Sequence, residues 1–341
     1  MEQDYYRRVM NGTQRGLAAM SLRALTAAVE PIYRGVVDAR NARFDRGTDV
    51  HRVDRPVISV GNITTGGTGK TPVVRWLAEA LRSRGIKPAI LMRGYKSKPN
   101  ELSDEQAELH SQLGDIVVHA NPDRVAGANE VLCDHADVQA FILDDGFQHR
   151  RLHRDFDLVL IDATNPFGFG HVLPRGLLRE PIAGLARASA ILITRADLAA
   201  SSIGHLDDHL HKLAPNAPIF RSAHEQFGLP PLNGKRIIAL SAIGNPDAFE
   251  QQLRSAGATI VQSKRFADHH HYSVNDLEDL AGADAVVTTE KDWVKISKLD
   301  LSRKSIPIWR VQVRVRFESD DESRLLSHVI RTTGLQPAGT S

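Results

Sequence analysis

The chain has 341 residues, of which 42% are apolar and 25% charged, as is ordinary for a globular protein with one or two α/β domains. Its net charge of +2 gives no argument for a nucleic-acid partner, and its single cysteine, Cys133, excludes an internal disulfide and a multi-cysteine metal site. No segment reaches the roughly 20 apolar residues that span a bilayer, and residues 1–16 lack a signal-peptide pattern. These features predict a protein that stays on the cytoplasmic side of the membrane, in a reducing compartment.

Residues 17–38 are predicted to form a helix with an apolar stripe flanked by arginines. Apolar residues recur there every three or four positions, which places them on one face. Such a helix suits a membrane interface, and the alternative is a helix packed on the core with solvated arginines. Pro31 argues against one uninterrupted helix. The stripe consists of Leu22, Leu25, Val29, Ile32 and Val36.

Beyond this helix, short apolar runs alternate with helical patterns. This alternation predicts an α/β fold with a mostly parallel sheet covered by helices, as in P-loop NTPases. The predicted strands of the first lobe are 57–60, 89–92, 116–119, 141–143, 158–161 and 191–194, and its helices are 70–84 and 123–135.

Prolines and a glycine in residues 213–235 indicate a linker, after which the alternation resumes in a second, smaller α/β lobe. Its predicted strands are 237–240, 259–261, 285–288 and 308–313, with helices from about 246 and near 274–281. The predicted division is an N-terminal basic amphipathic helix region (1–45), a P-loop kinase lobe (46–215), a second lobe (216–333) and a disordered tail (334–341).

The run Gly61-Asn62-Ile63-Thr64-Thr65-Gly66-Gly67-Thr68-Gly69-Lys70-Thr71 lies between a predicted strand and a predicted helix. Glycines let the backbone N–H groups surround phosphate, and the helix N-terminus adds positive potential. Lys70 is predicted to reach the β- and γ-phosphates of ATP, and the Thr71 hydroxyl to bind Mg²⁺. The alternative is a glycine-rich turn with a chance lysine. The predicted nucleotide-binding residues are Thr64, Thr65, Gly66, Gly67, Thr68, Gly69, Lys70 and Thr71.

The loop departs from the longer P-loop pattern, which would need glycine where this chain has Thr64. The shorter form G-G-x-G-K-T fits better. It occurs in a branch that includes partition ATPases and metal-insertion GTPases, which usually carry lysine at the place of Thr65.

Asp144 and Asp145 follow the predicted strand 141–143. A carboxylate at the end of a buried strand beside a P-loop is where Mg²⁺ is held, directly or through water. The alternative is a solvated Asp-Gly turn.

The ordered set of motifs resembles the tetraacyldisaccharide 4'-kinase (lipid A 4'-kinase) family, from the N-terminal helix to about residue 315. Besides the P-loop, the motifs are Arg93-Gly94-Tyr95, Asp144-Asp145-Gly146-Phe147-Gln148-His149, Leu173-Pro174-Arg175-Gly176, Leu178-Arg179-Glu180-Pro181, Phe266-Ala267-Asp268-His269 and Thr289-Glu290-Lys291-Asp292.

The resemblance implies transfer of the γ-phosphoryl group of ATP to the 4'-hydroxyl of a lipid disaccharide 1-phosphate. It implies a peripheral enzyme on the cytoplasmic face of the inner membrane, with the membrane surface and the lipid as partners. No obligate protein partner is evident. The resemblance also favours the membrane interpretation of residues 17–38.

The resemblance further implies roles for single residues. Asp144, Asp145 and Glu180 would form the acidic metal environment with Thr71, while Arg179 and Arg124 would neutralise phosphate charge near His149. An aspartate and a histidine would form the catalytic base pair, here Asp115 and His269. The family usually has Gly-Asp-Glu at the aspartate, and this chain has Gly114-Asp115-Ile116 there, without the second acid.

Two rival functions remain open from the residues alone. Thr194-Arg195-Ala196-Asp197 approximates the guanine-reading motif [NT]-K-x-D and would suit a P-loop GTPase or ATPase switch of the partition or metal-insertion type. The run His269-His270-His271, with Asp268 before it, suggests metal binding, although the side chains of adjacent residues diverge.

Overall fold

The protein is described by a computed structural model that covers residues 2–94, 104–243, 246–267, 270–280, 282–301 and 306–336. Its contacts divide the chain into two compact units. The first unit comprises Met1–Gly94, Leu113–His224 and Val315–Ser341, and the second comprises Tyr95–Gln112 and Glu225–Arg314.

This division corrects the predicted boundary at residue 215. The supposed linker contains strand β7 (Ile219–Phe227), which pairs in parallel with β6 (Ala190–Thr194) before it enters the second unit. The prolines that suggested a linker stand before and after residues 219–227, so no proline interrupts the ladder of hydrogen bonds. The last helix, α9 (Asp321–Thr333), belongs to the first unit and not to the second. Gly334 ends it, and residues 337–341 of the predicted tail lie outside the described residues.

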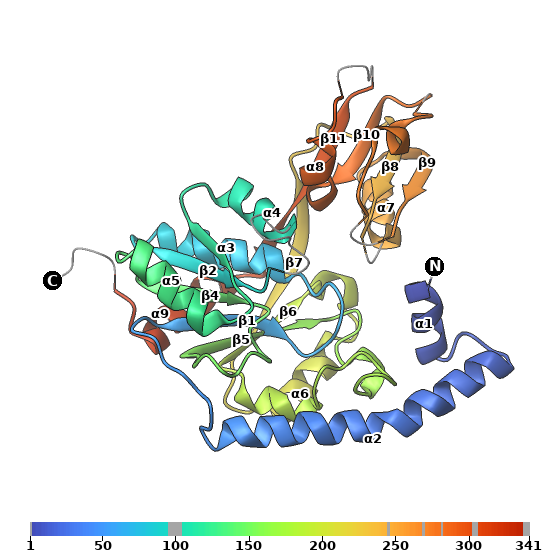
Figure 1. Ribbon diagram of the computed structural model, residues 1–341. Helices are drawn as coiled ribbons and strands as arrows, with labels where there is room; N and C mark the ends of the chain where they lie inside the picture. The colour runs from blue at the N-terminus through green and yellow to red at the C-terminus, as the bar shows by residue number, and fades with distance from the viewer. Residues whose placement is uncertain are drawn as a thin grey trace. The chain divides into compact units, whose positions relative to one another are not determined.

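The first unit contains a parallel sheet with the strand order β3-β2-β4-β1-β5-β6-β7 (Figure 1). Every residue of β1 is buried, as expected for a central strand that is covered on both faces. The carboxyl ends of β1 and β4 are neighbours, because Val60 pairs with Asp144. The remaining bounds are β1 (Val57–Asn62), β2 (Pro88–Met92), β3 (Val117–Ala120), β4 (Ala140–Asp144) and β5 (Phe156–Asp162).

Helices cover this sheet, as predicted. On one face, residues of β2 and β4 such as Leu91 and Phe141 pack against α5 (Arg124–Asp134). Helix α3 (Lys70–Arg82) also contacts these strands, and α9 contacts β1 and β5. Helix α6 (Ile203–Leu213) adds Leu206 and Leu210 to the core beside β5 and β6. Helix α4 (Asp104–Leu113) connects β2 to β3.

The second unit has the parallel strand order β11-β10-β8-β9. Its strands are β8 (Arg236–Ser241), β9 (Thr259–Arg265), β10 (Ala285–Thr289) and β11 (Ile308–Phe317), and its helices include α7 (Pro246–Ser255) and α8 (Glu290–Ile296). The helix predicted near 274–281 is only a short 3-10 turn, Val274–Leu277, closed by the capping box of Ser273 and Asp276.

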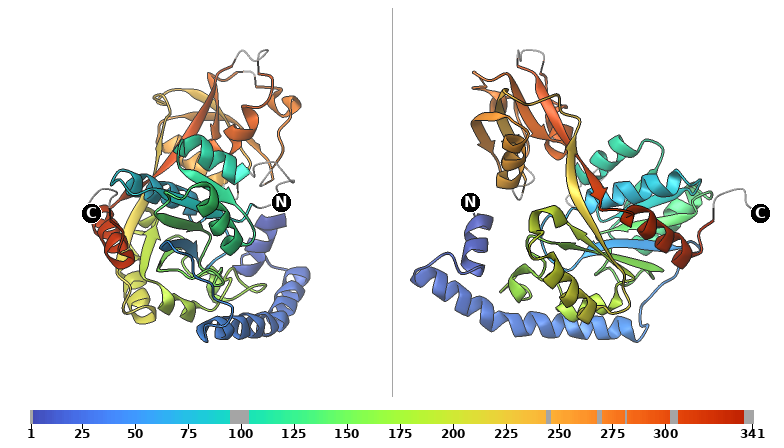
Figure 2. Two further views of the ribbon diagram at one scale, coloured as in Figure 1. Left: turned by 60° about the vertical axis from the view of Figure 1, so that its left-hand side comes forward. Right: turned by 180° about the vertical axis from the view of Figure 1, so that it is seen from behind.

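Helix α2 (Leu17–Asp45) is longer than predicted, and Pro31 lies within it without ending it (Figure 2). It follows α1 (Glu2–Met10), which the sequence did not predict. The apolar stripe faces outward: Leu25, Ile32 and Val36 are 61%, 69% and 66% exposed. The helix packs on the first unit through other residues, among them Tyr33 and Val37, so the stripe itself is not what packs on the core. Among the described residues, no helix has the length and apolar character needed to cross a membrane.

Candidate functional site

The glycine-rich run forms a loop between β1 and α3, as predicted for a P-loop. Gly66 and Gly69 adopt left-handed backbone angles, with φ of 114° and 85°, which side-chain-bearing residues rarely adopt. Helix α3 begins at Lys70, so its N-terminal amides and dipole face the loop. The loop thus has the backbone form of a phosphate-binding site.

The Lys70 side chain is held by two neighbouring groups. Its Nζ lies 3.1 Å from Oδ1 of Asn62 and 3.4 Å from Oδ1 of Asp145. Asn62 is fully buried and donates through Nδ2 to the carbonyl oxygen of Thr64, 2.8 Å away. Asn62 was not among the predicted site residues, although its place at the end of β1, directly before the loop, was a usable signal.

Asp144 and Asp145 lie beside the P-loop, as predicted. Asp144 is the last residue of β4, and Asp145 follows it with a left-handed φ of 52°. Arg179 donates to Oδ2 of Asp145 over 2.7 Å. Burial would raise the pKa of Asp145, but Lys70 and Arg179 outweigh it and hold that pKa below its usual range. Asp145 is therefore a carboxylate at neutral pH.

Glycines bring the loop after β4 close to β1. A Cβ at Gly61 would lie 2.6 Å from the Phe147 backbone nitrogen, and one at Gly146 would lie 2.7 Å from the Ser59 hydroxyl. No side chain fits at either place. The Asp-Asp-Gly-Phe string thus reaches the P-loop because of two close backbone approaches.

The segment that carries Arg179 runs beside the beginning of the P-loop. The Thr65 amide donates to the Leu177 carbonyl over 2.7 Å, and the Arg179 amide donates to the Ile63 carbonyl over 2.8 Å. Thr64 and Leu178 form an isolated antiparallel bridge between these contacts. Sequence-distant motifs are thereby joined by backbone pairing, which fixes the position of Arg179.

Glu180 is fully buried, and both of its carboxylate oxygens have partners. Arg187 donates to Oε2 over 2.6 Å, and Gln148 donates to Oε1 over 2.9 Å. The same Gln148 nitrogen lies 2.8 Å from the Asn62 carbonyl oxygen. In this arrangement Glu180 orients Gln148 and, through it, Asn62, which leaves it poorly placed for the predicted role as a metal ligand.

Arg124 and His149 lie near the two aspartates. Arg124 begins α5, is 5% exposed, and interacts electrostatically with Asp144 and Asp145. Burial, and after it the positive charge of Arg124, lowers the pKa of His149 to about 4. The buried Nε2 of His149 has no hydrogen-bond partner within the part of the chain that is described. His149 is therefore neutral at physiological pH.

Asp115 does not join this group. It lies just before β3, at the amino end of the strands, whereas the P-loop follows the carboxyl end of β1. Its side chain is 82% exposed and ion-paired with Arg82 over 2.6 Å. The sheet therefore argues against the prediction that Asp115 is the base. His269, its predicted partner, lies outside the described residues.

The residues behind the two rival functions are engaged in other ways. Thr194 and Arg195 donate to carbonyl oxygens of the P-loop, at Thr68 and Gly67. His270 stacks on Phe266 with 4.4 Å between ring centroids and contacts Asp276 over 3.2 Å. Within the described ranges, no group of three or more His, Cys, Asp or Glu side chains could hold a metal ion.

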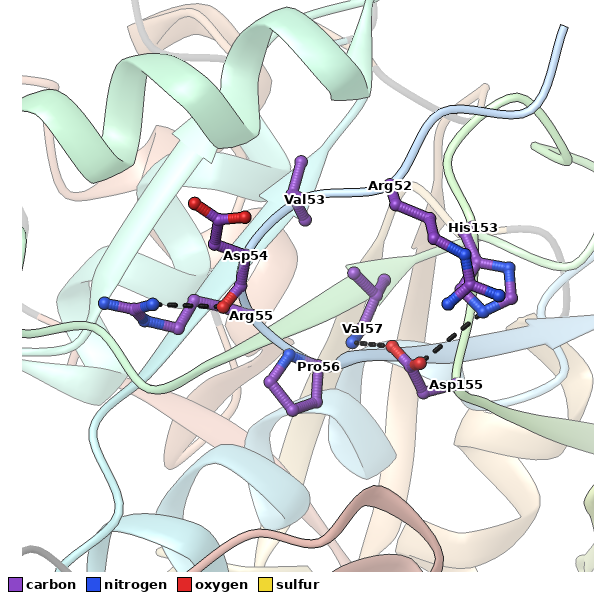
Figure 3. A pocket seen from close by; sticks show the side chains of 8 residues that line it. All are labelled: Arg52, Val53, Asp54, Arg55, Pro56, Val57, His153 and Asp155. Carbon is purple, nitrogen blue, oxygen red and sulfur yellow. Dashed lines mark hydrogen bonds and ion pairs between the residues drawn. The ribbon is translucent and has the colours of Figure 1, made fainter.

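A hollow of about 280 Å³ lies elsewhere in the first unit (Figure 3). It is lined by residues at the amino ends of β1 and β5, where Asp155 accepts from the Val57 amide over 2.8 Å. This is the edge of the parallel sheet that is remote from the P-loop. Its volume does not make it the site of the chemistry, because the loop, the lysine and the aspartates are at the other edge.

The neutral His149 makes stability depend on pH. Its folded pKa of about 4 lies below the ordinary value of 6.5, so between these values the unfolded chain binds more protons. The free energy of unfolding should fall as the pH drops from about 6.5 towards 4, by at most about 1.4 kcal/mol per pH unit. Urea unfolding of His149→Gln should show a shallower fall, whereas exposed His211→Gln should keep the wild-type slope. Equal slopes in all three proteins would contradict this assignment.

Comparisons with known proteins agree with this geometry. Residues 22–331 match the family model of tetraacyldisaccharide-1-P 4'-kinase. The chain is 36% identical over 326 residues to the tetraacyldisaccharide 4'-kinase of Geobacter sulfurreducens, covering 86% of this chain and 90% of the relative. It is 36% identical over 339 residues to that of Syntrophus aciditrophicus, with the same coverages of 86% and 90%. A crystal structure of LpxK from Aquifex aeolicus in complex with ATP is similar, with a TM-score of 0.73 at 27% identity, covering 92% of this chain and 99% of that one. The chain therefore belongs to the tetraacyldisaccharide 4'-kinase family.

Proposed function

We propose that this protein transfers the γ-phosphoryl group of ATP to the 4'-hydroxyl of a tetraacyldisaccharide 1-phosphate, a step of lipid A synthesis. The observation that carries the proposal is the P-loop lysine, Lys70, held between Asn62 and Asp145 in a chain of this family. The switch-type alternative is less well supported, because the relatives that cover most of the chain are named as kinases.

ATP would change the partner of Lys70. In the structure its ammonium faces Asp145, and phosphate oxygens in the loop would offer it a stronger set of negative charges. Arg179 already points to the same carboxylate, so it would neutralise charge beside the transferring group. Arg124 adds a second guanidinium near both aspartates. Fixed positive groups of this kind account for most of the catalysis of phosphoryl transfer.

Mg²⁺ would be held by few protein groups. In such sites the ion takes one or two carboxylates, phosphate oxygens and water. Thr71 follows the P-loop lysine, and Asp144 ends the strand beside β1, so these two residues fit best. Asp145 is paired with Lys70 and Arg179, and Glu180 with Arg187, so we assign them supporting roles. The ion would screen the phosphate charge during transfer.

The protein would act as a peripheral enzyme on the cytoplasmic face of the inner membrane. The acyl chains of the substrate do not leave the bilayer without a large hydrophobic cost, so the enzyme must reach the surface. The outward stripe of α2 offers apolar side chains for that purpose, including Ile32 and Val36. Arginines within α2, such as Arg34 and Arg40, would favour an anionic surface.

The general base needs a new assignment, since Asp115 is at the other edge of the sheet. We assign it to Asp104, which begins α4 after β2. The family usually has Gly-Asp-Glu at the aspartate; Ser103-Asp104-Glu105 supplies both acids without the glycine, whereas Gly114-Asp115-Ile116 supplies the glycine and one acid. His269 keeps its proposed role as the partner that orients the base.

The kinase activity is tested with labelled ATP and the lipid disaccharide acceptor. Purified protein should produce a labelled lipid in the presence of Mg²⁺. Lys70→Ala should abolish turnover, because it removes a positive charge from the transferring group. Circular dichroism and melting should show that this variant is folded. Near wild-type turnover in Lys70→Ala would contradict the assignment of this loop as the ATP-binding P-loop.

The two aspartates make a matched pair for testing the base. Asp104→Asn should lower kcat by roughly 10²–10⁴-fold, the usual worth of general-base assistance, with little change in the KM for ATP. Asp115→Asn should leave kcat nearly unchanged, because its side chain is exposed and paired with Arg82. The reverse result would restore Asp115 as the base and remove Asp104.

Membrane binding is tested by polar substitution within the stripe. Ile32→Ser with Val36→Ser should weaken binding to vesicles of anionic phospholipid roughly tenfold or more, because two apolar side chains lose their burial. Ala24→Ser with Ala28→Ser changes two exposed positions of the same helix without removing large apolar groups, and it should bind like wild type. Co-sedimentation measures both. Wild-type protein that stays in the supernatant at low salt would refute membrane docking.

A further inference from the structure

Three side chains, two at the end of β6 and one within β7, contact the P-loop. Thr194, the last residue of β6, donates through Oγ1 to the Thr68 carbonyl oxygen over 3.0 Å. Arg195, next in the chain, donates to the Gly67 carbonyl oxygen over 3.0 Å and is ion-paired with Asp162 at the end of β5. Two successive carbonyl groups of the loop are thus held by two successive side chains at the end of β6.

The planarity of the peptide bond gives these contacts a consequence. In a trans peptide the C=O and the following N–H point in opposite directions. When Thr194 holds the Thr68 carbonyl, the Gly69 N–H must point to the other side. That amide stands one residue before Lys70, where a P-loop directs N–H groups at phosphate. The Thr68 amide is used differently, because it closes a tight turn to the Gly66 carbonyl over 3.1 Å.

His224 of β7 completes the set. Its Nε2 would lie 2.3 Å, and its Cε1 2.5 Å, from a Cβ built on Gly69, so the edge of the ring lies against that glycine. The buried Nε2 has no hydrogen-bond partner within the part of the chain that is described. The ring therefore limits where the Gly69 peptide can move, by contact and not by a bond of its own.

We propose that Thr194, Arg195 and His224 are positioning residues that hold the P-loop with the Gly69 amide directed at the ATP phosphates. We name these three residues the P-loop brace. The inference rests on the proposed function only in taking ATP as the nucleotide. On this proposal Thr194 and Arg195 do not recognise a guanine base. Both side chains instead donate hydrogen bonds to carbonyl oxygens of the P-loop.

The sharpest test compares two replacements of Thr194. Thr194→Val keeps the shape and removes the hydroxyl, while Thr194→Ser keeps the hydroxyl. Calorimetric titration with Mg–ATP, without lipid acceptor, should give roughly three- to tenfold weaker binding for the valine variant and near wild-type binding for the serine variant. In the kinase assay the KM for ATP should rise with the same pattern, and kcat should change less.

Several outcomes distinguish the brace from the kinase assignment. Equal ATP affinity in both Thr194 variants and wild type overturns the brace while the kinase assignment stands. Wild-type protein that fails to bind Mg–ATP overturns both. If Thr194→Val does not fold, Arg195→Gln against Arg195→Lys supplies the same comparison at a less buried position. Equal ATP affinity in that pair likewise overturns the brace.

Discussion

The ion pair between Lys70 and Asp145 determines how the site of the first unit is built. A lysine with no counter-charge beside a partly buried loop would be costly, and a lone buried aspartate would be too. Each group satisfies the other, and Arg179 adds a second positive partner to the same carboxylate. With Arg124, three cations face the two carboxylates of Asp144 and Asp145, so the site keeps positive charge in excess. That excess suits the triphosphate of a nucleotide.

Several sequence-distant segments depend on this arrangement. The segment that ends in Arg179 pairs its backbone with the P-loop, and Tyr33 of α2 donates to the Arg179 carbonyl oxygen over 2.9 Å. Glu30 of α2 is ion-paired with Arg175 over 3.1 Å. Helix α2 therefore supports, with its inward face, the segment that positions Arg179, while its outward face carries the apolar stripe. The same helix serves the phosphate site and the proposed membrane contact.

The sequence predicted what depends on local pattern. The P-loop lies between a strand and a helix in chain order, so its place could be inferred, and Asp144 at the end of a buried run was inferred in the same way. Partnerships between distant residues could not be inferred. Nothing local shows that Glu180 is paired with Arg187 and Gln148, or that Thr194 reaches the P-loop. Asp115 was chosen by matching a motif by residue type, and sequence alone does not show that residues before a strand and after it lie at opposite edges of the sheet. Strand β7 was missed because prolines near it suggested a linker.

The left-handed backbone of Asp145 restricts which residue types related sequences can carry at this position. Few residue types adopt that conformation without strain, and asparagine, aspartate and glycine are the usual ones. Asparagine or glycine would keep the turn and lose the charge that faces Lys70. Glutamate would keep the charge and strain the backbone by about 1 kcal/mol or more. Aspartate alone satisfies the turn and the ion pair together, so no single substitution at this position preserves both the left-handed turn and the charge facing Lys70.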